Sequence, residues 1–194
     1  PESLRKGEPV ENEHPDTIAD GIATGSLSER TFEIIEQRVD EVVTVSDTEI
    51  ASATLWLLER TKQLTEGAAA ASVAPLLSET IEVEGTVVPL LCGGNIDIAT
   101  LQDVLTRALV DRRQFVTLRV RIDDQPGVLG ELASLIGEHD TNIRSVRHDR
   151  SEEGLPVGEA DLVMRLTTPS EAAIQGIIRD IEDAGYRVRD VVPS

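Results

Sequence analysis

The residues best suited to chemistry lie at Cys92-Gly93-Gly94-Asn95, where an apolar run stops and a helical pattern starts. The run is Val87-Val88-Pro89-Leu90-Leu91, and apolar residues at helical spacing continue from Ile98 to Leu109. Two glycines at the end of a strand uncover backbone N–H groups and let a ligand approach the chain closely. The segment therefore predicts a binding site, although the pattern alone does not specify the ligand.

A second candidate is the turn Asp124-Gln125-Pro126-Gly127, which joins an alternating strand pattern to a helix. Gly127 leaves the helix N-terminus bare, so its N–H groups could take a carboxylate. Asn142, which opens the next predicted strand, could offer its amide to an ammonium or carboxylate group. The alternative is purely structural, with Pro126-Gly127 as a turn and Asn142 as a strand-edge residue.

The charge balance excludes two classes of partner. Asp and Glu number 36 against 18 Lys and Arg, which gives a formal net charge of −18. Nucleic acids and anionic lipids are bound mainly through Lys and Arg, so we expect neither partner. No apolar run approaches the roughly 20 residues that span a bilayer. The single cysteine suits a reducing cytoplasm, and acid spread along the whole chain is typical of a salt-adapted, halophilic protein, with an ordinary acidic protein as the alternative.

The first half of the sequence predicts helices and strands in the order of a layered α/β protein. A helix should follow Ser28, and a capping box at Ser46-Asp47-Thr48-Glu49 should open another. Short strands are predicted at Glu41–Val45 and Val87–Leu91, and a small-residue helix at Ala68–Leu77. Two strands cannot make a doubly wound sheet, so we expect the missing strands to precede Pro1 or to come from another chain.

The second half follows a different pattern. Phe115–Asp123 alternates apolar and polar residues, and so does the segment from Ala160 to Leu166. With strands also at Asn142–Asp149 and Tyr186–Val192, a turn at Glu153-Gly154, and helices after Gly127 and Ser170, the predicted order is βαββαβ. We therefore expect two domains, 1–111 and 112–194, the second with an antiparallel sheet and two helices on one face.

This second half resembles an ACT domain, the ferredoxin-like regulatory module of amino-acid metabolism. In that family an amino-acid effector usually sits where the first strand-to-helix turn of one subunit meets the second strand of a neighbour. The resemblance implies isoleucine or valine as a possible effector. The effector-binding residues that it implies are Asp124, Pro126, Gly127, Val128, Leu129, Asn142 and Ile143.

The first half resembles the C-terminal part of the catalytic domain of the threonine dehydratases. These are fold type II (tryptophan synthase β-like) pyridoxal phosphate enzymes, a group that includes serine racemase. Four segments carry the resemblance in order, namely Thr17–Ala23, Val39–Val45, Glu66–Ala71 and Cys92–Asp97. The resemblance implies pyridoxal phosphate as cofactor and β-elimination of threonine, or serine, with threonine yielding 2-oxobutanoate and ammonia.

In this family a Ser or Cys faces the pyridine nitrogen of the cofactor, and Cys92 occupies that position. A weak S–H partner would leave the ring a moderate electron sink, which suits β-elimination. Asn95 is expected to start the helix behind the ring, and Glu66 lies at the family's acidic position near the cofactor. The cofactor-binding residues implied are Cys92, Gly93, Gly94, Asn95, Glu66 and Gly67.

The resemblance breaks at the Schiff-base lysine. The family's Ser-x-Lys-x-Arg-Gly segment and its glycine-rich phosphate loop are absent, and Lys6 and Lys62 stand in other contexts. We therefore assign no catalytic residue and expect this chain alone not to turn over threonine. His14, His139 and His148 lack metal-ligand spacing, so no metal site is predicted.

Two alternatives stay open. The chain could be a stand-alone amino-acid-binding ACT regulatory protein, or part of a serine/threonine dehydratase or racemase of the same family. The first residue is Pro1 and not Met, which suggests a piece of a larger enzyme. Sheets with bare edges tend to pair, so we expect a homodimer or homotetramer.

Overall fold

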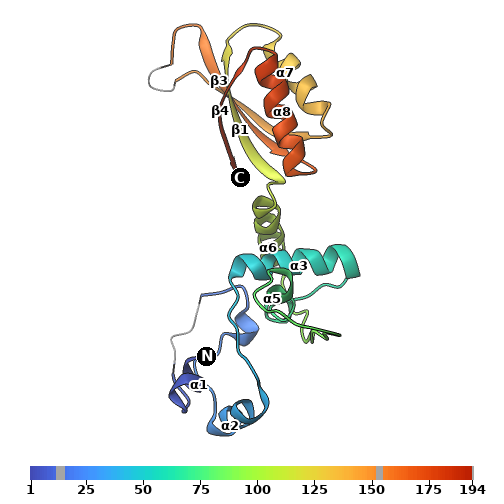
Figure 1. Cartoon of the computed structure of the whole chain (residues 1–194). Coiled ribbons are helices and arrows are strands. Elements are labelled where there is room, and N and C mark those ends of the chain that lie inside the picture. The colour runs from blue at the N-terminus through green and yellow to red at the C-terminus, as the bar shows by residue number, and fades with distance from the viewer. Residues whose placement is uncertain (12–15, 152–154, 194) are drawn as a thin grey trace. The chain divides into compact units, whose positions relative to one another are not determined.

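The computed structural model describes residues 1–11, 16–151 and 155–193, and the chain divides into two compact units, Pro1–Ala108 and Leu109–Ser194 (Figure 1). The described part of the first unit is helical. Its elements are α1 (Glu2–Lys6), the 3-10 turn η1 (Asp20–Ile22), α2 (Glu29–Arg38), α3 (Asp47–Thr61), α4 (Gly67–Ala70), α5 (Ala74–Leu77) and most of α6 (Ile98–Asp111). The turn expected at Glu153-Gly154 lies outside the described residues.

Local capping signals set the helix starts. The Ser28 side chain accepts from the Thr31 N–H and begins α2. The predicted capping box is confirmed, since Ser46 Oγ accepts from the Glu49 N–H at 3.3 Å and the Ser46 N–H donates to Glu49 Oε2 at 2.7 Å. Each side chain satisfies a backbone donor that the first turn of α3 would leave open.

Several predictions for the first unit are wrong. Asn95 does not start a helix; α6 begins at Ile98, where the apolar helical pattern begins, because Asp97 accepts from the N–H groups two and three residues on. Ala68–Leu77 is split into α4 and α5, with Pro75 in the first turn of α5.

The strands expected at Glu41–Val45 and Val87–Leu91 are also not formed. The described residues of the first unit contain no strand at all, so neither segment has a neighbour to pair with. A β-strand is stable only as part of a hydrogen-bonded ladder. Neither segment therefore forms a β-ladder, and the described part of this unit has no sheet layer.

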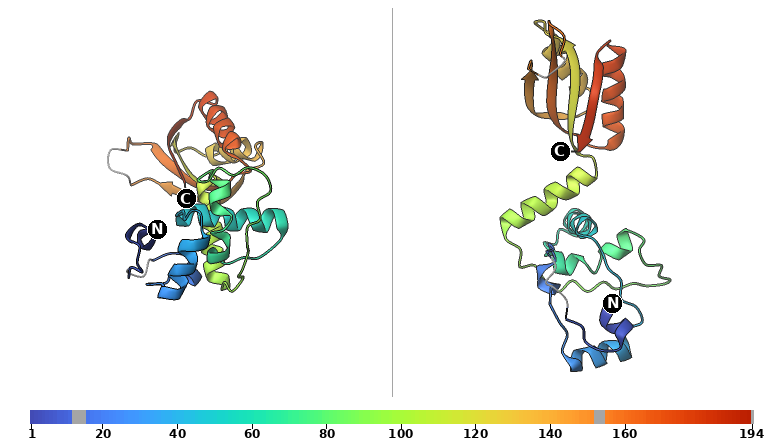
Figure 2. Two further views of the ribbon diagram at one scale, coloured as in Figure 1. Left: turned by 60° about the horizontal axis from the view of Figure 1, so that its bottom comes forward. Right: turned by 90° about the vertical axis from the view of Figure 1, so that its left-hand side faces the viewer.

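The second unit confirms the βαββαβ prediction. It contains β1 (Phe115–Asp123), α7 (Val128–Gly137), β2 (Asn142–Asp149), β3 (Glu159–Thr167), α8 (Glu171–Asp183) and β4 (Arg187–Pro193). The strands form one sheet in the order β2-β3-β1-β4, and every neighbouring pair is antiparallel. The further views in Figure 2 show α8 lying along the sheet.

Alternation along the strands builds the core of the second unit. In β1, Val116, Leu118, Val120 and Ile122 are buried, and the residues between them face the other side of the sheet. The buried face packs against Leu132 of α7 and the isoleucines of α8. Both helices therefore cover one face, and the turns at the strand ends are held at fixed positions.

Candidate functional site

Glu66 makes two hydrogen bonds to the Cys92–Asn95 segment, where the cofactor is predicted to bind. Its Oε2 accepts the Asn95 N–H at 2.9 Å, and its own backbone N–H donates to the Gly93 carbonyl at 3.4 Å. Glu66 is the residue immediately before α4, and Asn95 lies 29 residues further along the chain. The structure thus brings Glu66 and Gly67 beside the Cys92–Asn95 turn.

The glycines at this junction are required by close approach. A Cβ at Gly93 would lie 2.2 Å from Glu66 Oε1, and one at Gly67 would lie 2.3 Å from the Ile18 carbonyl oxygen. A Cβ at Gly94 would be 3.1 Å from the Leu64 carbonyl oxygen, which is a milder contact. Any side chain at Gly93 would push Glu66 away from the Asn95 N–H.

The Cys92 thiol is exposed. Its Sγ lies 3.9 Å from the Leu90 carbonyl oxygen, which is a weak hydrogen bond for sulfur. The thiol is therefore available to a ligand that approaches the end of the 87–91 segment.

An acidic pocket of about 370 Å³ lies next to Glu66, Gly67 and Asn95. Its lining adds four more carboxylates, those of Asp16, Asp20, Asp47 and Asp97. Cys92, Gly93 and Gly94 do not line it. So many carboxylates oppose a phosphate group, because like charges repel most strongly where water is partly excluded. The described residues therefore fit the pyridine side of pyridoxal phosphate, through the thiol and the glycine turn, and do not fit its phosphate.

The predicted effector residues fall into two groups. Asp124, Pro126, Gly127 and Leu129 line one pocket of about 470 Å³. Gly127 has a φ of 100° at the start of α7, a conformation that other residues rarely adopt. Val128 is half-buried and packs against the core.

Asn142 and Ile143 lie at the other end of the sheet. Asn142 is opposite Thr167, which in turn pairs with Phe115 at the start of β1, whereas Asp124 follows the end of β1. Within one chain these two residues cannot share a ligand with the Asp124 turn.

The structure adds His148 and Arg150 to the pocket, and sequence reasoning missed both. Arg150 Nε and one Nη atom hold the two carboxylate oxygens of Asp124 at 2.5 and 3.0 Å. The guanidinium hydrogen bond lowers the pKa of Asp124 below its ordinary value. The strand register brings them there, since the end of β2 lies near the β1–α7 turn when both strands flank β3.

No group of three or more His, Cys, Asp or Glu side chains within residues 1–11, 16–151 and 155–193 is placed to hold a metal ion. His139 Nε2 lies 2.6 Å from Asp180 Oδ2, and His14 is outside the described residues. In the same described ranges, no helix is long and apolar enough to cross a membrane.

Comparison with known proteins agrees with the family resemblance of each half of the chain. Residues 1–93 match the pyridoxal-phosphate dependent enzyme family, and residues 116–185 match the ACT domain. The chain therefore belongs to the pyridoxal-phosphate dependent enzymes over its first half and carries an ACT domain in its second. Pyridoxal phosphate is the cofactor of that family.

The relatives of this chain include L-threonine ammonia-lyases. The protein of that name from Geobacter sulfurreducens is 42% identical over 187 residues, which cover 96% of this chain and 46% of the relative. The one from Thermotoga maritima is 38% identical over 190 residues, covering 97% and 47%. A biosynthetic L-threonine dehydratase from Pasteurella multocida is 28% identical over 193 residues, covering 97% and 36%. The chain spans about half the length of the first two relatives.

Proposed function

We propose that this chain is part of a pyridoxal-phosphate-dependent threonine ammonia-lyase, which converts L-threonine to 2-oxobutanoate and ammonia. The observation that carries the proposal is the 42% identity to the Geobacter L-threonine ammonia-lyase, which runs through both domains in the same order. Serine is the second substrate to test, because the four segments that carry the resemblance do not include the residues that discriminate between threonine and serine.

In this proposal Cys92, Gly93, Gly94 and the backbone of Asn95 hold the pyridine side of the cofactor, which when bound supplies an electron sink for β-elimination. The Cys92 thiol offers the ring nitrogen a weak neutral donor. Glu66 holds the turn in place through the Asn95 N–H, so it is a positioning residue. None of these groups removes the α-proton of the substrate.

The test is a chimera in which this chain replaces the matching 187-residue region of the Geobacter enzyme. We expect the purified chimera to bind pyridoxal phosphate and to release 2-oxobutanoate from threonine. Cys92→Ser should retain activity and Cys92→Asp should lose most of it, because a carboxylate beside the ring nitrogen would raise the pKa of that nitrogen and keep it protonated. A folded chimera that binds the cofactor but deaminates neither threonine nor serine would contradict the proposal, and racemisation of serine would favour the racemase alternative.

We also propose that the pocket at the β1–α7 turn binds a branched amino acid. Arg150 is suited to the carboxylate of such a zwitterion and Asp124 to its ammonium group, while Leu129 and Pro126 offer apolar surface. The ligand would have to separate the Asp124–Arg150 ion pair, which is exposed and therefore costs little to break.

Calorimetric titration of the 194-residue chain with isoleucine and with valine tests this site. Arg150→Gln should weaken binding about tenfold or more, which corresponds to ~1.4 kcal/mol. The matched control is Arg179→Gln on the exposed surface of α8, which should bind like the unmodified chain. Equal affinities for the two variants would remove Arg150 from the site.

A homodimer or homotetramer in the cytoplasm completes the proposal. β2 and β4 are the edge strands of the ACT sheet, and Asn142 and Ile143 lie on β2. In the oligomer, β2 of one subunit would meet an effector bound at the β1–α7 turn of its neighbour. Asn142→Ala should then weaken amino-acid binding together with self-association, as followed by analytical ultracentrifugation. We further propose that the high negative charge is an adaptation to salt.

A further inference from the structure

The sheet of the ACT domain leaves one face bare, and arginines gather at one end of that face. α7 and α8 share a single core with the opposite face (Figure 1), and no described element of the second unit covers this one. The four strands carry seven of the 18 Lys and Arg residues of the chain. We call four of them the arginine end, namely Arg119, Arg144, Arg147 and Arg165.

The strand register brings three of these arginines together. Arg165 of β3 lies between Thr117 of β1 and Ser145 of β2. Arg119 and Arg147 both lie opposite the next residue of β3 that faces the same way. Side chains alternate along a strand, and the residues between these on β1 and β3 are buried under the helices. All three arginines therefore point to the bare face.

The fourth arginine reaches across the same face. Arg144 lies at the register shift in β2, and its guanidinium carbon is 4.5 Å from the centroid of the Phe115 ring at the start of β1. Phe115 precedes the buried Val116, so its ring is on the bare face, and the guanidinium lies over it in a cation–π contact. The four arginines thus occupy three neighbouring strands, a width of about 10 Å at the usual strand spacing.

The arginine end can accept further carboxylates. Arg165 is exposed and makes no ion pair among the described residues. Arg147 has a side chain that is 69% exposed, and its Nη2 lies 3.6 Å from Asp149 Oδ2, which is too long for a hydrogen bond. Both guanidinium groups therefore keep donors for an acidic partner.

The first unit supplies the opposite charge. Residues 1–108 contain 20 Asp and Glu against 7 Lys and Arg, whereas residues 109–194 contain 16 against 11. Because potentials of opposite sign attract across an interface, the arginine end of one copy favours the first unit of another copy over its sheet. Arginine is suited to such a contact, since its planar fork can bind a carboxylate with two hydrogen bonds.

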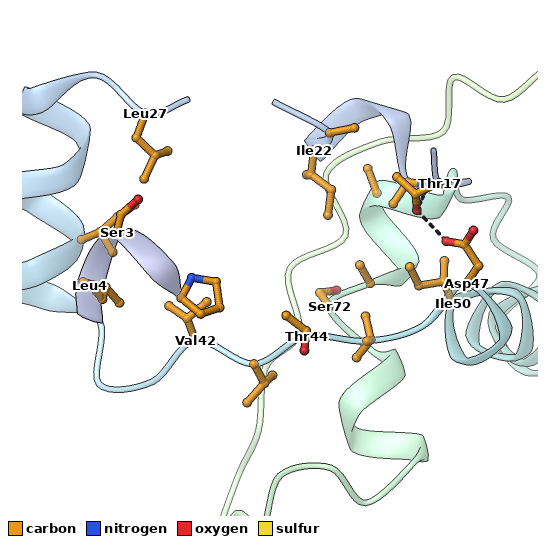
Figure 3. Close-up of a pocket in the computed structure, with 18 of the residues that line it drawn as sticks. Ser3, Leu4, Thr17, Ile22, Leu27, Val42, Thr44, Asp47, Ile50 and Ser72 are labelled. Carbon is orange, nitrogen blue, oxygen red and sulfur yellow. Dashed lines mark hydrogen bonds between the residues drawn. The ribbon is translucent and has the colours of Figure 1, made fainter. Parts of the chain in front are cut away.

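The apolar pocket of the first unit is not the surface that fits. It has a volume of about 870 Å³ and a mainly apolar lining, and Figure 3 shows Ile22 and Leu27 on opposite sides of it. Asp47 lines it too, but this carboxylate already accepts from the Thr17 hydroxyl. Guanidinium groups buried there would lose their hydration for few carboxylates. The carboxylates outside this pocket are therefore the ones that match the arginine end.

We propose that the arginine end docks on carboxylates of the first unit of a second copy of this chain. The bare face measures about 20 by 30 Å, so one contact would bury about 1,200 Å² over both copies, which exceeds the ~1,000 Å² of specific interfaces. Each copy carries both surfaces, so two copies can exchange the contact. This interface is separate from the β2 edge and does not depend on the lyase reaction.

Sedimentation velocity of the 194-residue chain over a range of concentrations measures the association. Arg165→Glu should raise the dissociation constant at least tenfold, because it replaces an attraction with a repulsion at the centre of the contact. The matched control is Arg179→Glu on the exposed surface of α8, which changes the net charge equally and should leave the constant within about twofold. Arg165→Gln, which adds no negative charge, should weaken association less than Arg165→Glu. Thermal unfolding checks that each variant is folded.

Carboxyl labelling with a carbodiimide and glycine ethyl ester, read by mass spectrometry, locates the occupant. We expect labelling of carboxylates in residues 1–108 to fall as the concentration rises. The same fall should occur in Arg179→Glu and in Asn142→Ala, which leaves the arginine end intact, and should be absent in Arg165→Glu.

Three results would overturn the inference. The first is a chain that stays monomeric at every concentration. The second is association that Arg165→Glu and Arg179→Glu weaken equally, since general repulsion then explains the effect. The third is protection confined to carboxylates of residues 109–194, because the second copy then docks with its ACT domain.

Discussion

At the scale of single residues, Asp161 is the clearest test of buried charge. It is fully buried on β3, and its carboxylate oxygens lie 2.5 and 3.2 Å from Arg121 Nε and Nη, with Arg119 Nη1 at 3.6 Å. The two arginines are themselves mostly buried, so neutralising the carboxylate weakens the compensation of their charge, although Glu159 Oε2 still lies 3.5 Å from Arg121 Nη1. Asp161→Asn should lower the free energy of unfolding of the ACT domain by about 3 kcal/mol.

Urea unfolding of the whole chain measures this change. The control is Asp183→Asn at the end of α8, where the side chain is exposed and the cost should stay within about 0.5 kcal/mol. If the two variants unfold at the same urea concentration, the ion cluster contributes no net stability.

Glu49 gives a pH-dependent prediction at the same scale. The backbone N–H of Ser46, then the side chains of Ser46 and Ser78, lower its pKa from 4.5 to about 2. Because the folded pKa is below the unfolded one, the carboxylate stabilises the fold above pH 4.5, and this contribution is lost as the pH falls towards 2. Glu49→Gln should therefore flatten the acid-unfolding curve of the first unit between these two pH values.

Circular dichroism during acid titration follows this change, with Glu36→Gln on the exposed face of α2 as the control. An acid-unfolding curve for Glu49→Gln that keeps the shape of the unmodified chain would remove Glu49 as a contributor.

The cofactor and effector residues show how far a sequence carries at this scale. Cys92 and its glycines could be selected because residue type and order are visible in one short segment. The Glu66–Asn95 hydrogen bond and the Asp124–Arg150 ion pair could not, since each joins residues 26 or more positions apart. The resemblance implied that Asn142 of one subunit meets the Asp124 turn of a neighbour, and the strand register agrees that the two lie apart within one chain.

At the scale of elements, two helical glycines should respond to alanine with opposite signs. A Cβ at Gly176 in α8 would lie 2.5 Å from His139 Cε1, whereas a Cβ at Gly130 in α7 meets nothing within 4 Å. Gly130→Ala should stabilise the ACT domain by about 0.5–1 kcal/mol through helix propensity. Gly176→Ala should destabilise it by about 1–3 kcal/mol, because the imidazole must move and lose its contact with Asp180.

Thermal unfolding of the two variants gives the comparison within one domain. Adding His139→Ala to Gly176→Ala removes the ring that the new methyl group meets, so the double variant should be no less stable than His139→Ala alone. If the double variant is less stable than His139→Ala by the full effect of Gly176→Ala alone, the clash is not with His139.

Helix caps were predicted better than the strands of the first unit for a physical reason. The cap at Ser46 and Glu49 and the cap at Ser170 are made within three residues, so the sequence contains the whole interaction. The strands of the ACT domain were also predicted, because all four partners are present in the chain. Glu41–Val45 carries an equally good strand pattern, but a ladder needs a neighbour that the described part of the first unit does not contain.

At the scale of the whole molecule, charge is the dominant property. Asp and Glu outnumber Lys and Arg by 36 to 18, which gives a net charge of −18. Some ion pairs among the described residues are well exposed, including Lys6–Glu2 and Arg113–Glu171, and such pairs add little stability. The excess carboxylates therefore repel one another across the surface, and compaction costs more when the solution contains little salt.

Added KCl should consequently stabilise the chain. The Debye length falls from about 10 Å at 0.1 M to about 3 Å at 1 M, which removes repulsion between all but neighbouring carboxylates. We expect the thermal unfolding midpoint to rise continuously over this range. A variant with several exposed carboxylates changed to their amides, for example Glu33, Glu36 and Asp183, should start from a higher midpoint and gain less from salt, because it has less repulsion to screen. If the midpoints of both proteins are indifferent to KCl, the acidity is not a salt adaptation; if both rise equally, the gain comes from water structure and not from charge screening.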